Sequence, residues 1–393
     1  MKQKLTFRAA MAATMLAFGL AAQPAIAADM TREVQAKLLD AQKAGGDKAV
    51  SLAKEALSAS KSGYDKEMSL KVLLSVAFKA KDYRSAVQAA EGLLDGGFAK
   101  GGERLQYTKY VADLSVQTRD YAKAATYYQK YIDARGAGAS ENDYFNAAQV
   151  ANLTGSYSQV MALGDKAAAS GRQRSEKLLL LQYNAAGKLG QAAKQRALME
   201  ELTRRFGKGE YVANMIAIHT KANGDKSMIL NLYRLAADRG GLKGQELGVA
   251  FAQDLVSAGA MSEAQAFLKK AKLKQDDKVK NVTRQADSFA DAEQKALAVK
   301  DKEARAAKNG ENDYRVAVTY FGMGKYAEAA EAARRGLQPD RVGRIKRVDE
   351  AQMLLGMALA RGKKAAEARA AFSEAKKDPR MAAAADLWFA LTK

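Results

Sequence analysis

Residue types that carry catalytic chemistry are scarce in this sequence. Nucleophile relays and zinc sites are built on histidine or cysteine, and the 393 residues include one histidine, His219, and no cysteine. His219 sits on a predicted helix, where a packed or surface position is expected. Ser-x-x-Lys occurs twice, at Ser51 with Lys54 and at Ser58 with Lys61, but no Lys-Thr-Gly accompanies it. Neither pair predicts a serine hydrolase.

Phosphate and carboxylate chemistry also lack a specific signal. The sequence has no Gly-Lys-Ser/Thr phosphate loop and no Gly-x-Gly-x-x-Gly after a predicted strand. Carboxylates are so frequent on charged helices that pairs of them do not single out a glycosidase. We therefore expect no enzyme, no cofactor and no metal, and a peptidoglycan-related enzyme ranks third among the functions considered.

A tyrosine-rich stretch, RDYAKAATYYQKYI (119–132), raises the question of whether its rings bind a ligand or fill a core. Tyr121, Tyr128 and Tyr131 recur at helical spacing with small alanines between them, whereas Tyr127 lies off this stripe. An apolar stripe of this kind is typical of a packed helix face. The stretch therefore predicts a buried helix.

The N-terminus has the pattern of a secretory signal peptide. Lys2, Lys4 and Arg8 precede an apolar run that is short for a membrane span, and Ala25-Ile26-Ala27 fits a cleavage site. We expect cleavage after Ala27 and export to the periplasm. No later stretch is long and apolar enough to span a membrane.

The composition predicts a basic, all-helical protein. The formal net charge is +20, or +17 without the three signal-peptide bases, and there are only three prolines. A basic exported protein favours acidic proteins or peptides, anionic polysaccharide or lipid head groups, whereas export argues against nucleic acid. Without cysteine, packing alone must hold the fold.

A turn followed by small and packing residues recurs along the chain. The spacing between copies is in the thirties apart from one 65-residue gap, which is typical of a solenoid of helical hairpins. The small or aliphatic marker residues are Ala86, Ala124, Val160, Ala192, Ile229, Ala264, Ala329 and Ala368.

These copies resemble the tetratricopeptide repeat (TPR) family. The last copy carries the family's pattern best, with Leu355-Gly356, Leu359, Ala368, Phe372, Ala375 and Pro379. The preceding copy keeps Ala317, Tyr320, Ala329 and Gly336 in the same frame. The resemblance implies an all-α, right-handed superhelical solenoid of TPR-like antiparallel helix pairs.

The expected organisation has three parts after the signal peptide (1–27). A solenoid block covers 28–271, a charged helical connector or degenerate repeat covers 272–310, and further repeats with a capping helix cover 311–393. We prefer a solvated charged helix for 272–310. Trp388 and Phe389 are expected to anchor the capping helix on the last repeat.

The resemblance also implies a binding groove lined by the first helix of each pair. Its expected residues are basic or amide side chains that can attract carboxylates and pair with a peptide backbone. They are Lys71, Lys79, Lys109, Asn142, Asn146, Gln149, Asn152, Arg174, Lys177, Asn184, Asn214 and Lys221. The favoured function is accordingly a periplasmic protein-interaction scaffold with an acidic protein or peptide partner.

Assistance in export of an anionic exopolysaccharide is the alternative. Sugar rings stack on exposed aromatic side chains, so this alternative requires such side chains in the groove. The candidates are Phe78, Tyr211, Tyr314 and Phe321.

Some family members hold a terminal carboxylate with a clamp of bases and asparagines. Lys109, Asn146 and Arg174 match three clamp positions here, but Asp113 and Leu178 depart from the pattern. Asp113, one turn from Lys109, is expected to neutralise part of its charge.

A second candidate site is the arginine-rich segment RRGLQPDRVGRIKR (334–347). Its concentration of bases around a turn predicts an exposed patch that attracts anions. The residues are Arg334, Arg335, Arg341, Arg344, Lys346 and Arg347.

Overall fold

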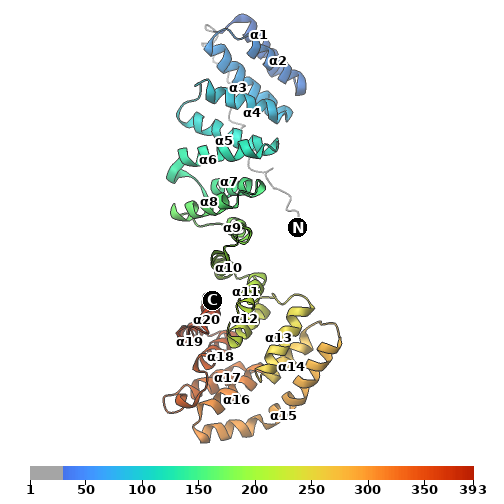
Figure 1. Ribbon diagram of the computed structural model, residues 1–393, viewed down its shortest axis with the longest axis vertical. Coiled ribbons are helices and arrows are strands. Elements are labelled where there is room, and N and C mark those ends of the chain that lie inside the picture. The colour runs from blue at the N-terminus through green and yellow to red at the C-terminus, as the bar shows by residue number, and fades with distance from the viewer. Residues whose placement is uncertain (1–29) are drawn as a thin grey trace. The chain divides into compact units, whose positions relative to one another are not determined.

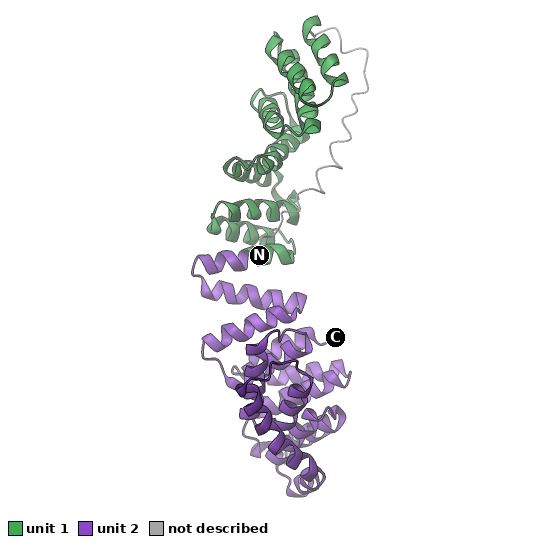
Figure 2. Ribbon diagram, turned by 90° about the vertical axis from the view of Figure 1, so that its right-hand side faces the viewer, with its two compact units in different colours: residues 1–181 green, residues 182–393 purple. Residues whose placement is uncertain are grey.

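The computed structural model describes residues 30–393, and all regular secondary structure in this part is helical. The expected signal peptide lies outside the described residues. Two compact units divide the chain within one helix, α9: unit 1 ends at Leu181 and unit 2 covers Gln182–Lys393 (Figure 2). This division differs from the repeat-based boundary that we placed at residue 271.

Unit 1 is a succession of helix pairs (Figure 1). Its helices are α1 (Arg32–Lys43), α2 (Gly46–Ala59), α3 (Gly63–Ala80), α4 (Tyr83–Asp95), α5 (Gly101–Gln117), α6 (Tyr121–Arg135), α7 (Glu141–Leu153), α8 (Tyr157–Ala169) and the beginning of α9 (Glu176–Lys188).

Unit 2 continues the pattern and adds one long helix. After α9 it contains α10 (Ala192–Phe206), α11 (Gly209–Lys221), α12 (Lys226–Asp238), α13 (Gln245–Ser257), α14 (Met261–Lys270), α15 (Asp277–Ala307), α16 (Gly310–Gly322), α17 (Tyr326–Gly336), α18 (Val348–Arg361), α19 (Ala365–Ala375) and α20 (Ala382–Leu391).

The turn inside most pairs contains one residue with a left-handed backbone. Where this residue is not glycine, a polar or long side chain takes the position, as at Lys81, Arg119, Asn223 and Lys363. Asp82 and Asp120 follow two of these turns and accept a hydrogen bond from the first turn of the next helix. The reversal of direction is therefore built locally, from residues adjacent in sequence.

Packing within the last repeat depends on one glycine. A Cβ atom on Gly356 of α18 would lie 2.4 Å from a ring carbon of Phe372 on α19, so only glycine allows this approach. Phe372 is fully buried, as is Ala368 one turn earlier. The all-α architecture of paired helices, predicted from the repeat, is confirmed.

The tyrosine-rich stretch forms α6 and faces the core as predicted. Tyr128 is fully buried, and Tyr131 is 7% exposed. Tyr127, which lies off the stripe, is half-buried, and burial together with Glu91 raises its pKa to about 12. These rings are packing residues.

Residues 277–307 form one uninterrupted helix, α15, in place of a helix pair. Val279, Val282, Ala286, Ala290 and Leu297 are buried on one face, which packs against α13, α14 and α16. Phe289 and Val299 are exposed. Within the segment 272–310 the charged helix covers Asp277–Ala307, and it is solvated on one side only, because its apolar stripe covers neighbouring pairs.

Unit 2 closes on itself through its last helices. Trp388 of α20 packs against Phe372, as expected for a cap, with ring centroids 5.7 Å apart. Phe389, which was expected to anchor the helix as well, is 40% exposed. The indole Nε1 of Trp388 also donates a 2.9 Å hydrogen bond to the carbonyl of Asn231 in α12. Arg239 Nη2, just after α12, donates to the carbonyl of Leu391 at 2.5 Å. The chain end therefore packs against a helix about 150 residues earlier (Figure 1).

Replacement of Tyr128 tests the packing of unit 1. We expect Tyr128→Ala to lower the free energy of unfolding by about 3–5 kcal/mol, because it removes a fully buried aromatic ring. Urea denaturation followed by circular dichroism measures the loss. Gln129→Ala, on the neighbouring and more exposed position of α6, should change stability by less than about 1 kcal/mol. Equal, small effects of both variants would contradict the core assignment.

Candidate functional site

In unit 1, the first helix of one pair lies next to the first helix of the following pair. Lys71 Nζ on α3 lies 3.7 Å from Glu103 Oε1 on α5. At the other end, Lys177 Nζ on α9 lies 5.9 Å from the ring centroid of Phe145 on α7, and the Ser175 amide donates to Glu141 at 3.0 Å. Side chains on these helices therefore contribute to shared surfaces.

An amide stripe lies on α7. Asn142, Asn146 and Gln149 are spaced by four and three residues, which places them on one helix face. Asn142 is exposed and the other two are half-buried. None of the three side chains makes a hydrogen bond to another residue between 30 and 393. The stripe thus offers donors and acceptors to a ligand.

The carboxylate clamp is not assembled as the family pattern implies. Lys109 Nζ pairs with Asp113 at 2.8 Å, and the Tyr128 hydroxyl donates to the same carboxylate at 2.5 Å. Burial and this carboxylate raise the pKa of Tyr128 well above its ordinary value. Leu178, where a base was required, is fully buried. The expected neutralisation of Lys109 by Asp113 is present in the structure.

Four further groove candidates have different surroundings. Lys71 pairs with Glu67 at 2.7 Å, within its own helix. Lys79 is exposed and lines a cavity of about 300 Å³ beside the turn between α1 and α2. Arg174 is half-buried just before α9, and Asn184 is exposed on the part of α9 that belongs to unit 2. Of these, Lys79 and Asn184 present accessible polar groups.

The candidate aromatic side chains for sugar stacking are packed. Tyr211 is 4% exposed and Phe321 1% exposed. Phe78 packs near the ring of Tyr83, and the Tyr314 hydroxyl donates to Glu350 at 3.1 Å. Tyr211 and Phe321 therefore do not meet the requirement of the exopolysaccharide alternative, because both are core residues of their helix pairs.

The arginine-rich segment does not form the exposed patch that we expected. Arg341 is 8% exposed, and its Nη1 pairs with the buried Asp313 at 2.9 Å. Arg335 pairs with Asp313 and with Asp301, each at 2.6 Å. Both arginines point inward because the buried carboxylate of Asp313 on α16 requires cationic partners.

The remaining bases of that segment differ in their surroundings. Arg347 pairs with Asp349 at 2.6 Å and with Asp225 at 3.2 Å, so its charge is also used internally. Arg334 pairs with Glu367 on the surface. Arg344 and Lys346 are exposed. An anion-binding role remains a prediction for the exposed bases alone.

Unit 2 contains a cavity of about 740 Å³ that sequence reasoning missed. Its walls are the turn after α13, one face of α15, one face of α16 and the beginning of α18. Glu293, Leu297 and Lys300 on α15 have the spacing of one helix face, and this was the available signal. The facing wall could not be found in the sequence, because it depends on how unit 2 closes.

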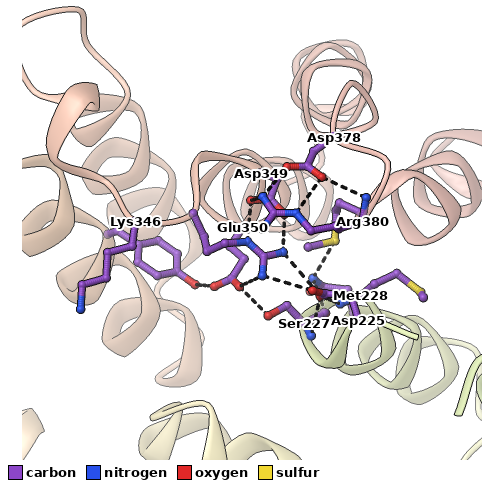
Figure 3. A network of polar contacts seen from close by, with 12 residues as sticks. Asp225, Ser227, Met228, Lys346, Asp349, Glu350, Asp378 and Arg380 are labelled. Atoms are coloured by element: carbon purple, nitrogen blue, oxygen red, sulfur yellow. Dashed lines mark hydrogen bonds and ion pairs between the residues drawn. The ribbon is translucent and has the colours of Figure 1, made fainter. Parts of the chain in front are cut away.

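One end of this cavity is a dense polar network (Figure 3). Glu350 accepts hydrogen bonds from Tyr314 at 3.1 Å and from Ser227 at 2.5 Å. Burial, followed by the charge of Glu350, raises the pKa of Tyr314. Arg347 reaches Asp225, so α12, α16 and α18 meet here. The network fixes three helices around the cavity.

The charged side chains of α15 that line the cavity make fewer polar contacts than the network does. Glu293 is half-buried and makes no ion pair with another described residue. Burial raises the pKa of Glu293, and Lys300 acts in the opposite direction. Lys300 is exposed and likewise unpaired within the described part of the chain.

Metal-ligating groups are not brought together in the residues described. No group of three or more His, Cys, Asp or Glu side chains with the arrangement of a metal site occurs between 30 and 393. His219 on α11 is half-buried, and burial, with a smaller effect of Arg196, lowers its pKa. In this same range no helix has the length and apolar character needed to cross a membrane.

The succession of hairpins and the contact of Gly356 with Phe372 agree with the family resemblance. The fold is an all-α succession of helix pairs, as that resemblance implied. No family model and no curated protein matches the sequence.

Solved structures similar to this TPR-like chain include a tetratricopeptide repeat protein from Parabacteroides merdae ATCC 43184, at 12% identity, covering 73% of this chain and 99% of that one, with a TM-score of 0.22. The APC/C hetero-tetramer Cut9-Hcn1 matches at 13% identity over 80% of this chain and 66% of its own, with a TM-score of 0.26. Naa15/Naa10 bound to HypK-THB matches at 15% identity over 86% of this chain and 62% of its own, with a TM-score of 0.28.

Substitutions in the arginine-rich segment distinguish internal from exposed charge. We expect Arg341→Ala to destabilise unit 2 by about 3–5 kcal/mol, because it removes a partner of a buried carboxylate. Arg344→Ala, three residues later and exposed, should change stability by less than about 0.5 kcal/mol. Urea denaturation of both variants decides the matter. A stable Arg341→Ala protein would mean that this arginine is ordinary surface.

Proposed function

We propose that this TPR-like protein is a periplasmic interaction scaffold that binds extended peptides or partner proteins on the first-helix surface of unit 1. The observation that carries the proposal is the amide stripe Asn142, Asn146 and Gln149. A half-buried amide without a partner loses hydrogen bonds to water and gains none in return. A peptide backbone can satisfy both its N–H and its C=O groups.

Charge supports an acidic partner. Lys177 lies beside Phe145, one residue from Asn146, and Lys79 is exposed on α3. Lysines at the margin of a polar surface increase the rate of association with carboxylate-rich chains, an effect that salt screens. Acidic proteins and peptides are the proposed partners, ahead of anionic polysaccharide or lipid head groups.

The proposed location follows from the N-terminal sequence. A basic n-region, a short apolar run and the Ala25-Ile26-Ala27 cleavage pattern support export. The exopolysaccharide alternative has less support, because Tyr211 and Phe321 do not present ring faces to a sugar. We propose no catalytic step.

Capture from the envelope fraction tests the amide stripe. The wild-type protein, Asn146→Ala/Gln149→Ala and the matched control Ser158→Ala/Gln159→Ala on α8 are immobilised and incubated with the same extract. We expect the first double variant to weaken retention of specific partners by about thirtyfold, since two neutral hydrogen bonds contribute roughly 1 kcal/mol each. The control should retain them, and moderate salt should weaken all binding to acidic partners.

Two outcomes would contradict the proposal. One is an identical set of retained proteins, at equal amounts, for all three forms. The other is loss of partners with the α8 control as well, which would place binding on another face.

A further inference from the structure

The cavity of unit 2 is not used by the scaffold function proposed for unit 1. It measures about 740 Å³, which is within the range of small-ligand sites. At one end, Glu350 and Arg347 are already engaged with each other and with α12 and α16. At the same end, Glu311 accepts from Arg315 and from the backbone of Lys346. These groups shape the cavity and have little capacity left for a ligand.

Charged side chains of α15 that line the cavity make no ion pair with another described residue. Glu293 and Lys300 lie on one face of this helix, and Glu303 follows one turn after Lys300. A half-buried carboxylate without a partner is costly, and an ammonium group would relieve that cost. The raised pKa of Glu293 expresses the same cost, since burial disfavours its charged form.

The spacing of these charges sets the length of a ligand. Seven residues of α-helix separate Glu293 from Lys300, which is about 10 Å along the helix axis. Three residues of extended peptide span about 10 Å. Lys346, exposed at the same cavity, adds a second positive charge for a carboxylate.

The rest of the lining favours peptide over sugar. Tyr314 is the aromatic residue of the lining, and its hydroxyl is bound to Glu350. Asn312 and Thr319 supply polar side chains, and Leu297 and Val316 supply an apolar wall. Sugars are held by stacking on open ring faces, whereas short peptides need opposite charges and a mixed lining.

We propose that this cavity binds a short zwitterionic peptide of about three residues. Its free amino group pairs with Glu293, and its terminal carboxylate pairs with Lys300 and Lys346. Both pairs are charge-assisted, so each terminus contributes to affinity.

A mixture of tripeptides with randomised side chains tests the site on the full-length exported protein. The free mixture, its N-acetylated form and its C-amidated form are passed over immobilised protein, and retained peptides are quantified by mass spectrometry. We expect each capped mixture to be retained at least about tenfold less than the free mixture. Glu293→Gln should abolish the effect of acetylation, and Lys300→Gln should reduce the effect of amidation.

Lys295→Gln is the matched control, since Lys295 is exposed on α15 and does not line the cavity. It should behave as the wild type. Equal retention of free and capped mixtures would overturn the proposal, as would an effect of acetylation that survives Glu293→Gln in a protein with wild-type circular dichroism. Retention of neutral trisaccharides in place of peptides would also overturn it. Loss of peptide retention with Asn146→Ala/Gln149→Ala would instead assign the peptides to unit 1.

Discussion

Unit 2 depends on the contacts of α12 with α20 and with α18 and the loop before it. A helix pair leaves an apolar face uncovered until another element packs on it, so a linear succession must end in a cap. Here α20 packs on α19 through Trp388 and Phe372 and also on α12 through the indole hydrogen bond to Asn231. This second contact joins α20 to α12 and is the closure of unit 2.

Polar groups at both ends of α12 add to the closure. Asp225 begins α12 by accepting from the Ser227 and Met228 amides, and it also pairs with Arg347 (Figure 3). One carboxylate thus serves as a helix cap and as a long-range ion pair. Arg361 pairs with Asp238 at the other end of α12, at 3.0 Å. The two ends of this helix are each fixed by a base from α18 or the loop before it.

Internal pairing changes the meaning of the net charge. A formal charge of +20 suggests a strongly basic surface, yet Arg341 and Arg335 neutralise carboxylates inside unit 2, and Lys109 neutralises Asp113 inside unit 1. Bases at a surface steer ligands, whereas bases in buried pairs do not. Among the predicted groove lysines, Lys79 and Lys177 are exposed, and the proposed binding of acidic partners relies on such side chains.

Local and long-range features differ in how far the sequence predicts them. The helix pairs and the burial of Tyr128 follow from short-range spacing, which determines a helix face. The same spacing placed the amides of α7 together. The burial of Arg341 could not be predicted, because it depends on Asp313, which is 28 residues away in sequence and on another helix. The closure could not be predicted either, because no sequence pattern near Asn231 indicates a contact with Trp388, 157 residues later.

Hydrogen exchange tests the closure most directly. In Trp388→Ala we expect amides of α12 and of α18 to exchange faster than in the wild type, while amides of α3 to α8 in unit 1 keep their protection. Exchange is measured by mass spectrometry at equal protein concentration, with Phe389→Ala as the control on the more exposed neighbouring position. Faster exchange confined to α19 and α20, with α12 unchanged, would mean that α20 is only a terminal cap and would contradict the account.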